Sequence, residues 1–84
     1  MPKDDIVRLR HILDAAREAL SFISGKARVD LNANRMLVLS LVKEIEIIGE
    51  AAGKISEETK NKYKGIPWLD MIDMRNHLIH VYFE

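Results

Sequence analysis

The apolar residues of this chain recur at intervals of three and four, and only two prolines and four glycines interrupt them. Such spacing gathers apolar side chains on one side of an α-helix. No useful stretch alternates with the period of two that a half-buried strand needs, so an all-α fold is expected. A first helix is predicted over 4–23, with an apolar stripe of Ile6, Leu9, Leu13, Ala16, Leu20 and Ile23.

A second helix is predicted from a start near residues 30–34, where Asp and Asn offer capping oxygens, to about Lys54. The apolar residues of this segment cover a wide arc of the helix, which predicts a central helix with neighbours on two sides. Gly49 inside it costs about 1 kcal/mol relative to alanine, which favours a close helix approach at that point. The arc consists of Leu37, Val38, Leu41, Val42, Ile45, Ile48, Ala51, Ala52 and Ile55.

Two further helices complete the expected organisation. A short polar helix follows Ser56 as its cap and reaches about Tyr63, and a last helix runs from Trp68, just after Pro67, to the chain end. Because 84 residues leave room for one domain only, we expect a single domain over 1–84. The predicted architecture is a small up-down bundle of three long helices and one short helix.

Charge and composition exclude several classes of function. Thirteen basic and thirteen acidic residues balance, so the chain as a whole is not attracted to nucleic acid or to anionic membranes. The absence of cysteine excludes disulfides, thiol nucleophiles and zinc-thiolate sites. No apolar run approaches the roughly 18 residues of a membrane span, and no glycine-rich phosphate loop or serine triad is recognisable. A cytoplasmic protein without membrane contact is expected.

The last helix carries one residue that conflicts with its surroundings. Projected at about 100° per residue, Arg75 falls inside the apolar arc of this helix. A guanidinium is costly to bury unpaired, so it needs a carboxylate, a backbone carbonyl or an anionic ligand. The simplest interpretation is an ion pair with Glu44, at the edge of the second helix's arc. The apolar arc itself contains Trp68, Met71, Ile72, Leu78, Ile79 and Tyr82.

Two polar clusters leave alternatives open. Asp70, Asp73, His77 and His80 lie along one side of the last helix. They suit either a solvated face or a divalent metal, but one helix rarely completes a coordination sphere, so neither metal nor cofactor is expected. A lysine cluster in the short helix is either solvated or holds an RNA backbone, with Tyr63 and Trp68 as stacking surfaces. These lysines are Lys60, Lys62 and Lys64.

The C-terminal string Met-Arg-Asn-His-Leu-Ile-His-Val-Tyr-Phe over 74–83 resembles the signature of HEPN-domain proteins, in which Arg and His are separated by four residues. Its Arg-x-x-x-x-His-x-Tyr pattern is most similar to the HepT toxin subfamily. Ile-Ile-Gly-Glu-Ala-Ala over 47–52 and Ile-Pro-Trp over 66–68 agree with this resemblance, which covers roughly 35–83.

The resemblance implies a helical bundle that dimerises and, in active members, cuts RNA without a metal ion. By position, Arg75 and His80 would be the catalytic pair and Asn76 a supporting polar neighbour. Tyr82 would be the tyrosine to which a nucleotidyltransferase antitoxin of the MntA type adds AMP. The resemblance implies no role for the extra imidazole of His77. Members of the family usually continue with another long helix, whereas this sequence stops at Glu84.

Physical chemistry is compatible with the implied roles. Histidine titrates near neutrality and can take a proton from a ribose hydroxyl, while a guanidinium can hold charge on a phosphate. Five positions separate Arg75 from His80, which puts them about 140° apart on a helix. A dimer would gather two such pairs in one cleft, so we expect a homodimer with its site at or beside the interface.

Two functions remain as hypotheses. The first is a HepT-like toxin, a metal-independent endoribonuclease that acts on RNA and is neutralised by a nucleotidyltransferase that modifies Tyr82. The alternative is a non-catalytic helical dimer that serves as the binding partner of a nucleotidyltransferase, with Arg75 in a structural ion pair.

Overall fold

A computed structural model of the chain describes residues 1–83, and within this range it contains five helices and no strand. Three are long: α1 (Lys3–Ile23), α3 (Arg35–Lys54) and α5 (Trp68–Phe83). Two are short: α2 (Arg28–Ala33) and α4 (Glu57–Lys62). The all-α prediction is therefore confirmed. Glu84, with which the predicted last helix ends, lies outside the described residues.

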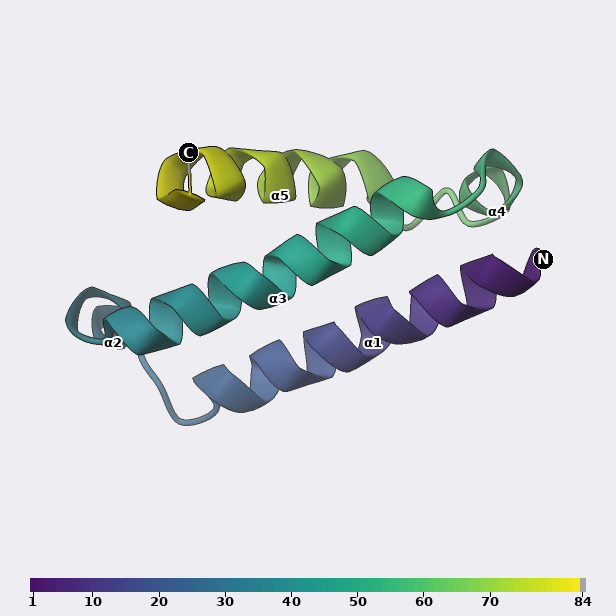
Figure 1. Ribbon diagram of the computed structural model, residues 1–84. Helices are drawn as coiled ribbons and strands as arrows, with labels where there is room; N and C mark the ends of the chain where they lie inside the picture. The colour runs from purple at the N-terminus through teal and green to yellow at the C-terminus, as the bar shows by residue number, and fades with distance from the viewer. Residues whose placement is uncertain (84) are drawn as a thin grey trace.

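Helix α3 is the centre of the molecule, because α1 and α5 both pack against it along their length (Figure 1). The wide apolar arc predicted for α3 is buried or half-buried throughout. The small core lies where Ala52 of α3 and Ile55, the residue just after this helix, meet Trp68 at the start of α5. Half-buried side chains surround it: Leu9, Ile12, Met71 and Ile72.

The chain has one short helix more than predicted. Residues 28–33 form α2, a separate six-residue helix, before α3 begins. The Asp30 carboxylate accepts a hydrogen bond from the Ala27 N–H (2.7 Å), and Asn34 then caps α3 by accepting from the Leu37 N–H (3.0 Å). Both proposed capping residues are therefore used, but each starts a different helix.

The buried side of α1 is not the side on which its apolar stripe was predicted. Its buried positions include Asp5 and Ala15, whereas most of the predicted stripe is exposed. The buried and half-buried positions of α1 follow a neighbouring stripe: Asp5, Arg8, Leu9, Ile12, Ala15, Ala16, Ala19 and Phe22. The exposed members of the stripe are Ile6, Leu13, Leu20 and Ile23.

A buried carboxylate joins α1 to α4. Asp5 accepts hydrogen bonds from the Ser56 N–H (3.0 Å), the Ser56 hydroxyl (2.6 Å) and the Thr59 hydroxyl (2.6 Å). The Ser56 hydroxyl also caps α4, as predicted, by accepting from the Thr59 N–H (3.2 Å). Hydrogen bonds from Ser56 and then Thr59 hold the pKa of the Asp5 carboxyl below its ordinary value. This cluster fixes the end of the bundle from which α5 starts.

Candidate functional site

The orientation of α5 is set at its first residue. Trp68 is buried, with 8% of its surface exposed, and its indole Nε1–H donates to the Tyr63 carbonyl (3.1 Å). From there the predicted apolar arc faces α3, and its members between 71 and 79 are half-buried. The predicted polar stripe points to solvent, with all four of its side chains exposed: Asp70, Asp73, His77 and His80.

Arg75 lies inside the apolar arc, as the helical projection predicts, and is half-buried. Its Nη1 donates to the side-chain oxygen of the neighbouring Asn76 (2.9 Å). Its Nε is buried and finds no hydrogen-bond partner within residues 1–83. A buried donor without a partner is costly, and the guanidinium also has no carboxylate partner among the described residues.

The predicted ion pair between Arg75 and Glu44 is wrong. Within the described part of the chain no salt bridge joins them. Glu44 lies on the side of α3 that faces α1, in a hollow that Glu18 also lines. Arg75 instead packs at Gly49, five positions later and about 140° around α3. The helical projection placed Glu44 at the edge of an arc but could not say which neighbouring helix that edge meets.

Glu44 is itself an unusual residue, because it is buried and its Oε2 has no hydrogen-bond partner among the described residues. Burial raises the pKa of Glu44 above its ordinary value, and the negative charge and carboxyl of Glu18 raise it further. The Glu44 and Glu18 carboxyls therefore come close together at the α1–α3 junction. The sequence pattern contained no signal for this pair.

Gly49 was predicted to mark a close helix approach, and the structure confirms it. A Cβ added there would lie 2.8 Å from the Arg75 Cγ and 2.8 Å from the Met71 carbonyl oxygen. Glycine is therefore what allows α5 to lie so close to α3 at Arg75.

The remaining candidates occupy the surface. Asn76, His80 and Tyr82 are all exposed on α5, Tyr82 by 37%. The polar stripe is not a preformed metal site, since residues 1–83 contain no group of three or more His, Asp or Glu side chains able to hold a metal ion.

The lysine cluster on and beside α4 is only partly available for a ligand. Lys60 pairs with Glu57 (3.8 Å), and the Lys62 ammonium lies 5.6 Å from the centre of the Tyr63 ring. The proposed use of Trp68 as a stacking surface is wrong, because the indole is buried in the core.

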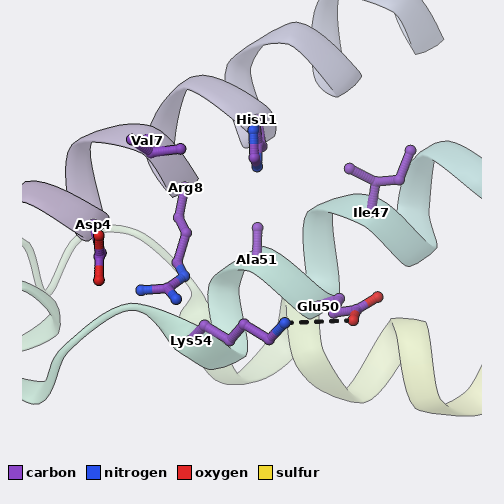
Figure 2. A pocket seen from close by; sticks show the side chains of 8 residues that line it. All are labelled: Asp4, Val7, Arg8, His11, Ile47, Glu50, Ala51 and Lys54. Atoms are coloured by element: carbon purple, nitrogen blue, oxygen red, sulfur yellow. Dashed lines mark ion pairs between the residues drawn. The ribbon is translucent and has the colours of Figure 1, made fainter.

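A hollow of about 430 Å³ lies between α1 and α3, and no residue of α5 lines it. Figure 2 shows Arg8 and His11 extending from α1 toward it, with Lys54 and Glu50 paired on α3 (3.6 Å). Arg75 and His80 therefore do not line this hollow.

Comparison with known proteins decides the family. The model of the family described as "Ribonuclease HepT-like" matches residues 12–84. This range includes the whole of α3 and α5. The chain belongs to this HepT-like family. The predicted resemblance is thereby confirmed, and the match includes the Arg-x-x-x-x-His-x-Tyr pattern at Arg75, His80 and Tyr82.

Several relatives of this HepT-like chain carry ribonuclease names. A protein of Methanocaldococcus jannaschii, provisionally named an RNase, is 33% identical over 84 residues, covering 99% of this chain and 77% of the relative. A protein of Thermococcus cleftensis, provisionally named ribonuclease HepT, is 37% identical over 84% of this chain and 68% of the relative.

A second Methanocaldococcus jannaschii relative combines two activities in its name, gamma-glutamylcyclotransferase and provisional RNase. It is 35% identical over 83 residues, and the HepT-like chain spans 37% of its length. No solved structure matches the chain significantly. None of the helices in residues 1–83 is long and apolar enough to cross a membrane.

Proposed function

We propose that this HepT-like chain is a metal-independent endoribonuclease in which Arg75 and His80 form the catalytic pair and Asn76 supports Arg75. The observation that carries the proposal is the guanidinium of Arg75, set into the apolar side of α5 with no carboxylate paired to it within residues 1–83. A phosphate offers anionic oxygens to the outer N–H donors of this guanidinium. The ribonuclease names of the relatives agree with this assignment.

The proposed chemistry uses the ribose itself as nucleophile. His80 takes the proton from a 2′-hydroxyl, whose oxygen then attacks the adjacent phosphorus and displaces the 5′-oxygen of the next nucleotide. Arg75 stabilises the negative charge that gathers on the non-bridging phosphate oxygens. The products are a 2′,3′-cyclic phosphate and a 5′-hydroxyl, and the leaving 5′-oxygen needs a proton from a second acid.

A homodimer would supply that acid. On α5, Arg75 is half-buried and His80 is exposed, so the two side chains of one copy start from different sides of the helix. Two paired copies of α5 would present two imidazoles to one phosphate. Exposed apolar side chains on α5 support such pairing: Leu69, Met74, Val81 and Phe83.

We further propose that the protein is a toxin and that a nucleotidyltransferase antitoxin of the MntA type neutralises it. The antitoxin would transfer AMP from ATP to the Tyr82 hydroxyl and release pyrophosphate. Tyr82 is exposed, and seven positions place it about 20° from Arg75 around the helix axis. An added phosphate there repels the substrate backbone. RNA and ATP are both present in the cytoplasm, where the proposed reaction takes place.

The test compares RNA cleavage in the presence of EDTA by the wild type, His80→Ala and the matched control His77→Ala. Both histidines are exposed on α5, so His77→Ala is a matched control for the removal of an exposed imidazole from this helix. We expect His80→Ala to slow cleavage about 10²–10⁴-fold and His77→Ala to leave it nearly unchanged.

Equal cleavage by all three proteins contradicts the assignment of His80. No cleavage by any of them supports the alternative, a non-catalytic dimer that binds the nucleotidyltransferase. Mass spectrometry of protein coexpressed with a nucleotidyltransferase antitoxin of the MntA type tests the modification, with Tyr82→Phe as the control that gains no AMP.

A further inference from the structure

Helices α3 and α5 approach each other tightly at Arg75, the residue that carries the proposed phosphate-binding group. A Cβ at Gly49 would lie 2.8 Å from the Arg75 Cγ and closer still to the Arg75 Cβ. It would also lie 2.8 Å from the Met71 carbonyl oxygen, one turn earlier on α5. A side chain at position 49 therefore meets both the backbone of α5 and the first two carbons of the Arg75 side chain.

The next glycine on α3 behaves differently. Gly53 lies one turn after Gly49 and is exposed, and a Cβ there would meet only the Ile72 Cγ1, at 4.0 Å. That distance is ordinary van der Waals contact. The requirement for glycine is thus confined to the turn of α3 opposite Arg75, and it is not a general property of the α3–α5 junction.

This contact determines which part of the guanidinium can reach a ligand. The Arg75 stem lies against Gly49, the Nε is buried, and the Nη1 donates one hydrogen to Asn76. A guanidinium has five N–H donors, so about three remain for an anion at its outer end. Displacing the stem changes both the position and the direction of these donors.

We infer that Gly49 is a positioning residue for Arg75, fixing the guanidinium where it meets the scissile phosphate. The inference depends on the proposed role of Arg75 in RNA cleavage. A misplacement of about 1 Å can slow a reaction about 10²-fold, so the absent side chain at position 49 is expected to matter as much as many groups that touch substrate.

The experiment compares Gly49→Ala with Gly53→Ala, which add the same methyl group one turn apart on α3. We expect Gly53→Ala to cut RNA like the wild type and to unfold at a slightly higher temperature, because alanine favours helix. Gly49→Ala is expected to lower kcat about 10²-fold with KM nearly unchanged, after correction for the folded fraction measured by circular dichroism.

Two further readouts separate positioning from a general loss of structure. The NMR signal of the Arg75 Nε–H is expected to shift in Gly49→Ala and to stay in place in Gly53→Ala. In an Arg75→Ala background, Gly49→Ala is expected to slow cleavage no further, whereas a general structural defect would slow it again. If Gly49→Ala alone does not fold, it is made in the Gly53→Ala background, whose added helix propensity offsets part of the strain.

The outcomes distinguish this inference from the proposed function. If folded Gly49→Ala cuts RNA like Gly53→Ala and the Arg75 signal does not move, the positioning role is wrong while Arg75 keeps its proposed role. If Arg75→Ala cuts RNA like the wild type, the proposed catalytic role of Arg75 is wrong, and the positioning role is overturned with it.

Discussion

At the scale of single residues, two buried carboxyls have opposite acid–base properties. Asp5 accepts three hydrogen bonds from Ser56 and Thr59, which lowers its pKa. Glu44 has no such donors and faces Glu18, so burial and the neighbouring carboxyl raise its pKa. The fold therefore favours the anionic form of Asp5 and shifts Glu44 toward its neutral form.

Because of the Glu44 carboxyl, the stability of the fold is expected to fall as pH rises. A folded-state pKa above the unfolded value means that its stabilisation is fully present below the unfolded pKa, near 4.5, and is lost as pH rises through the folded pKa. The other titratable side chains that line the hollow beside Glu44 are His11, Asp14 and Glu18.

We expect Glu44→Gln to remove this loss, since an amide cannot ionise and can donate to Glu18. The melting temperature of the variant relative to the wild type should rise between pH 4 and pH 7. Thermal unfolding over this range is the measurement, with exposed Glu50→Gln on the same helix as control. A difference that stays constant with pH contradicts the raised pKa of Glu44.

Residue-scale prediction from sequence succeeded where helical periodicity alone decides the outcome. It placed Arg75 in the apolar arc of α5 and marked Gly49 for a close approach. It assigned the wrong partner to Arg75, because the angle at which α3 meets each neighbour depends on packing. Nothing local to Glu44 indicates that it meets Glu18 across the α1–α3 junction.

At the scale of helices, the three long ones were predicted well because apolar spacing and caps agree at their ends. Helix α2 was missed as a separate element, since six residues are too few to show a helical period. The stripe of α1 was predicted correctly as a pattern but not as a buried face. Spacing identifies an apolar side, whereas contact with α3 selects the positions that are buried.

The cap of α3 gives a prediction at this scale. Asn34 accepts a hydrogen bond from the Leu37 N–H, so Asn34→Ala should destabilise the fold by about 0.5–2 kcal/mol. Asn32→Ala, in the exposed α2, is the matched control and should change stability much less. Urea unfolding measures both variants. Equal effects would mean that the cap contributes no stability of its own.

At the scale of the whole molecule, the long helices lie with α3 between α1 and α5 (Figure 1). Apolar side chains remain exposed on both outer helices. The exposed fractions of Met74 and Val81 on α5 are 51% and 55%. A neutral, cysteine-free chain of 84 residues gains stability by covering such surface, which agrees with the proposed dimer. Sequence alone predicted the need for association but not which helix faces remain open.

The double variant Met74→Gln, Val81→Gln tests the proposed pairing through α5. Loss of two buried apolar contacts per copy should raise the dimer Kd at least about tenfold, since each buried side chain contributes about 1.5–3 kcal/mol. Sedimentation equilibrium measures Kd, and RNA cleavage should fall in parallel. The control variant, Leu13→Gln with Leu20→Gln on α1, should leave both unchanged. A wild type that cuts RNA as a strict monomer contradicts the pairing.

The most direct test of the central claim is cleavage of one single-stranded RNA, and of DNA of the same sequence, with EDTA present, by the wild type and Arg75→Ala. The account predicts that the wild type cuts the RNA and leaves the DNA intact, because DNA lacks the 2′-hydroxyl nucleophile. It predicts that Arg75→Ala, with its fold retained, cuts the RNA about 10²–10³-fold more slowly. Cleavage of the DNA, or undiminished cleavage of RNA by Arg75→Ala, would contradict it.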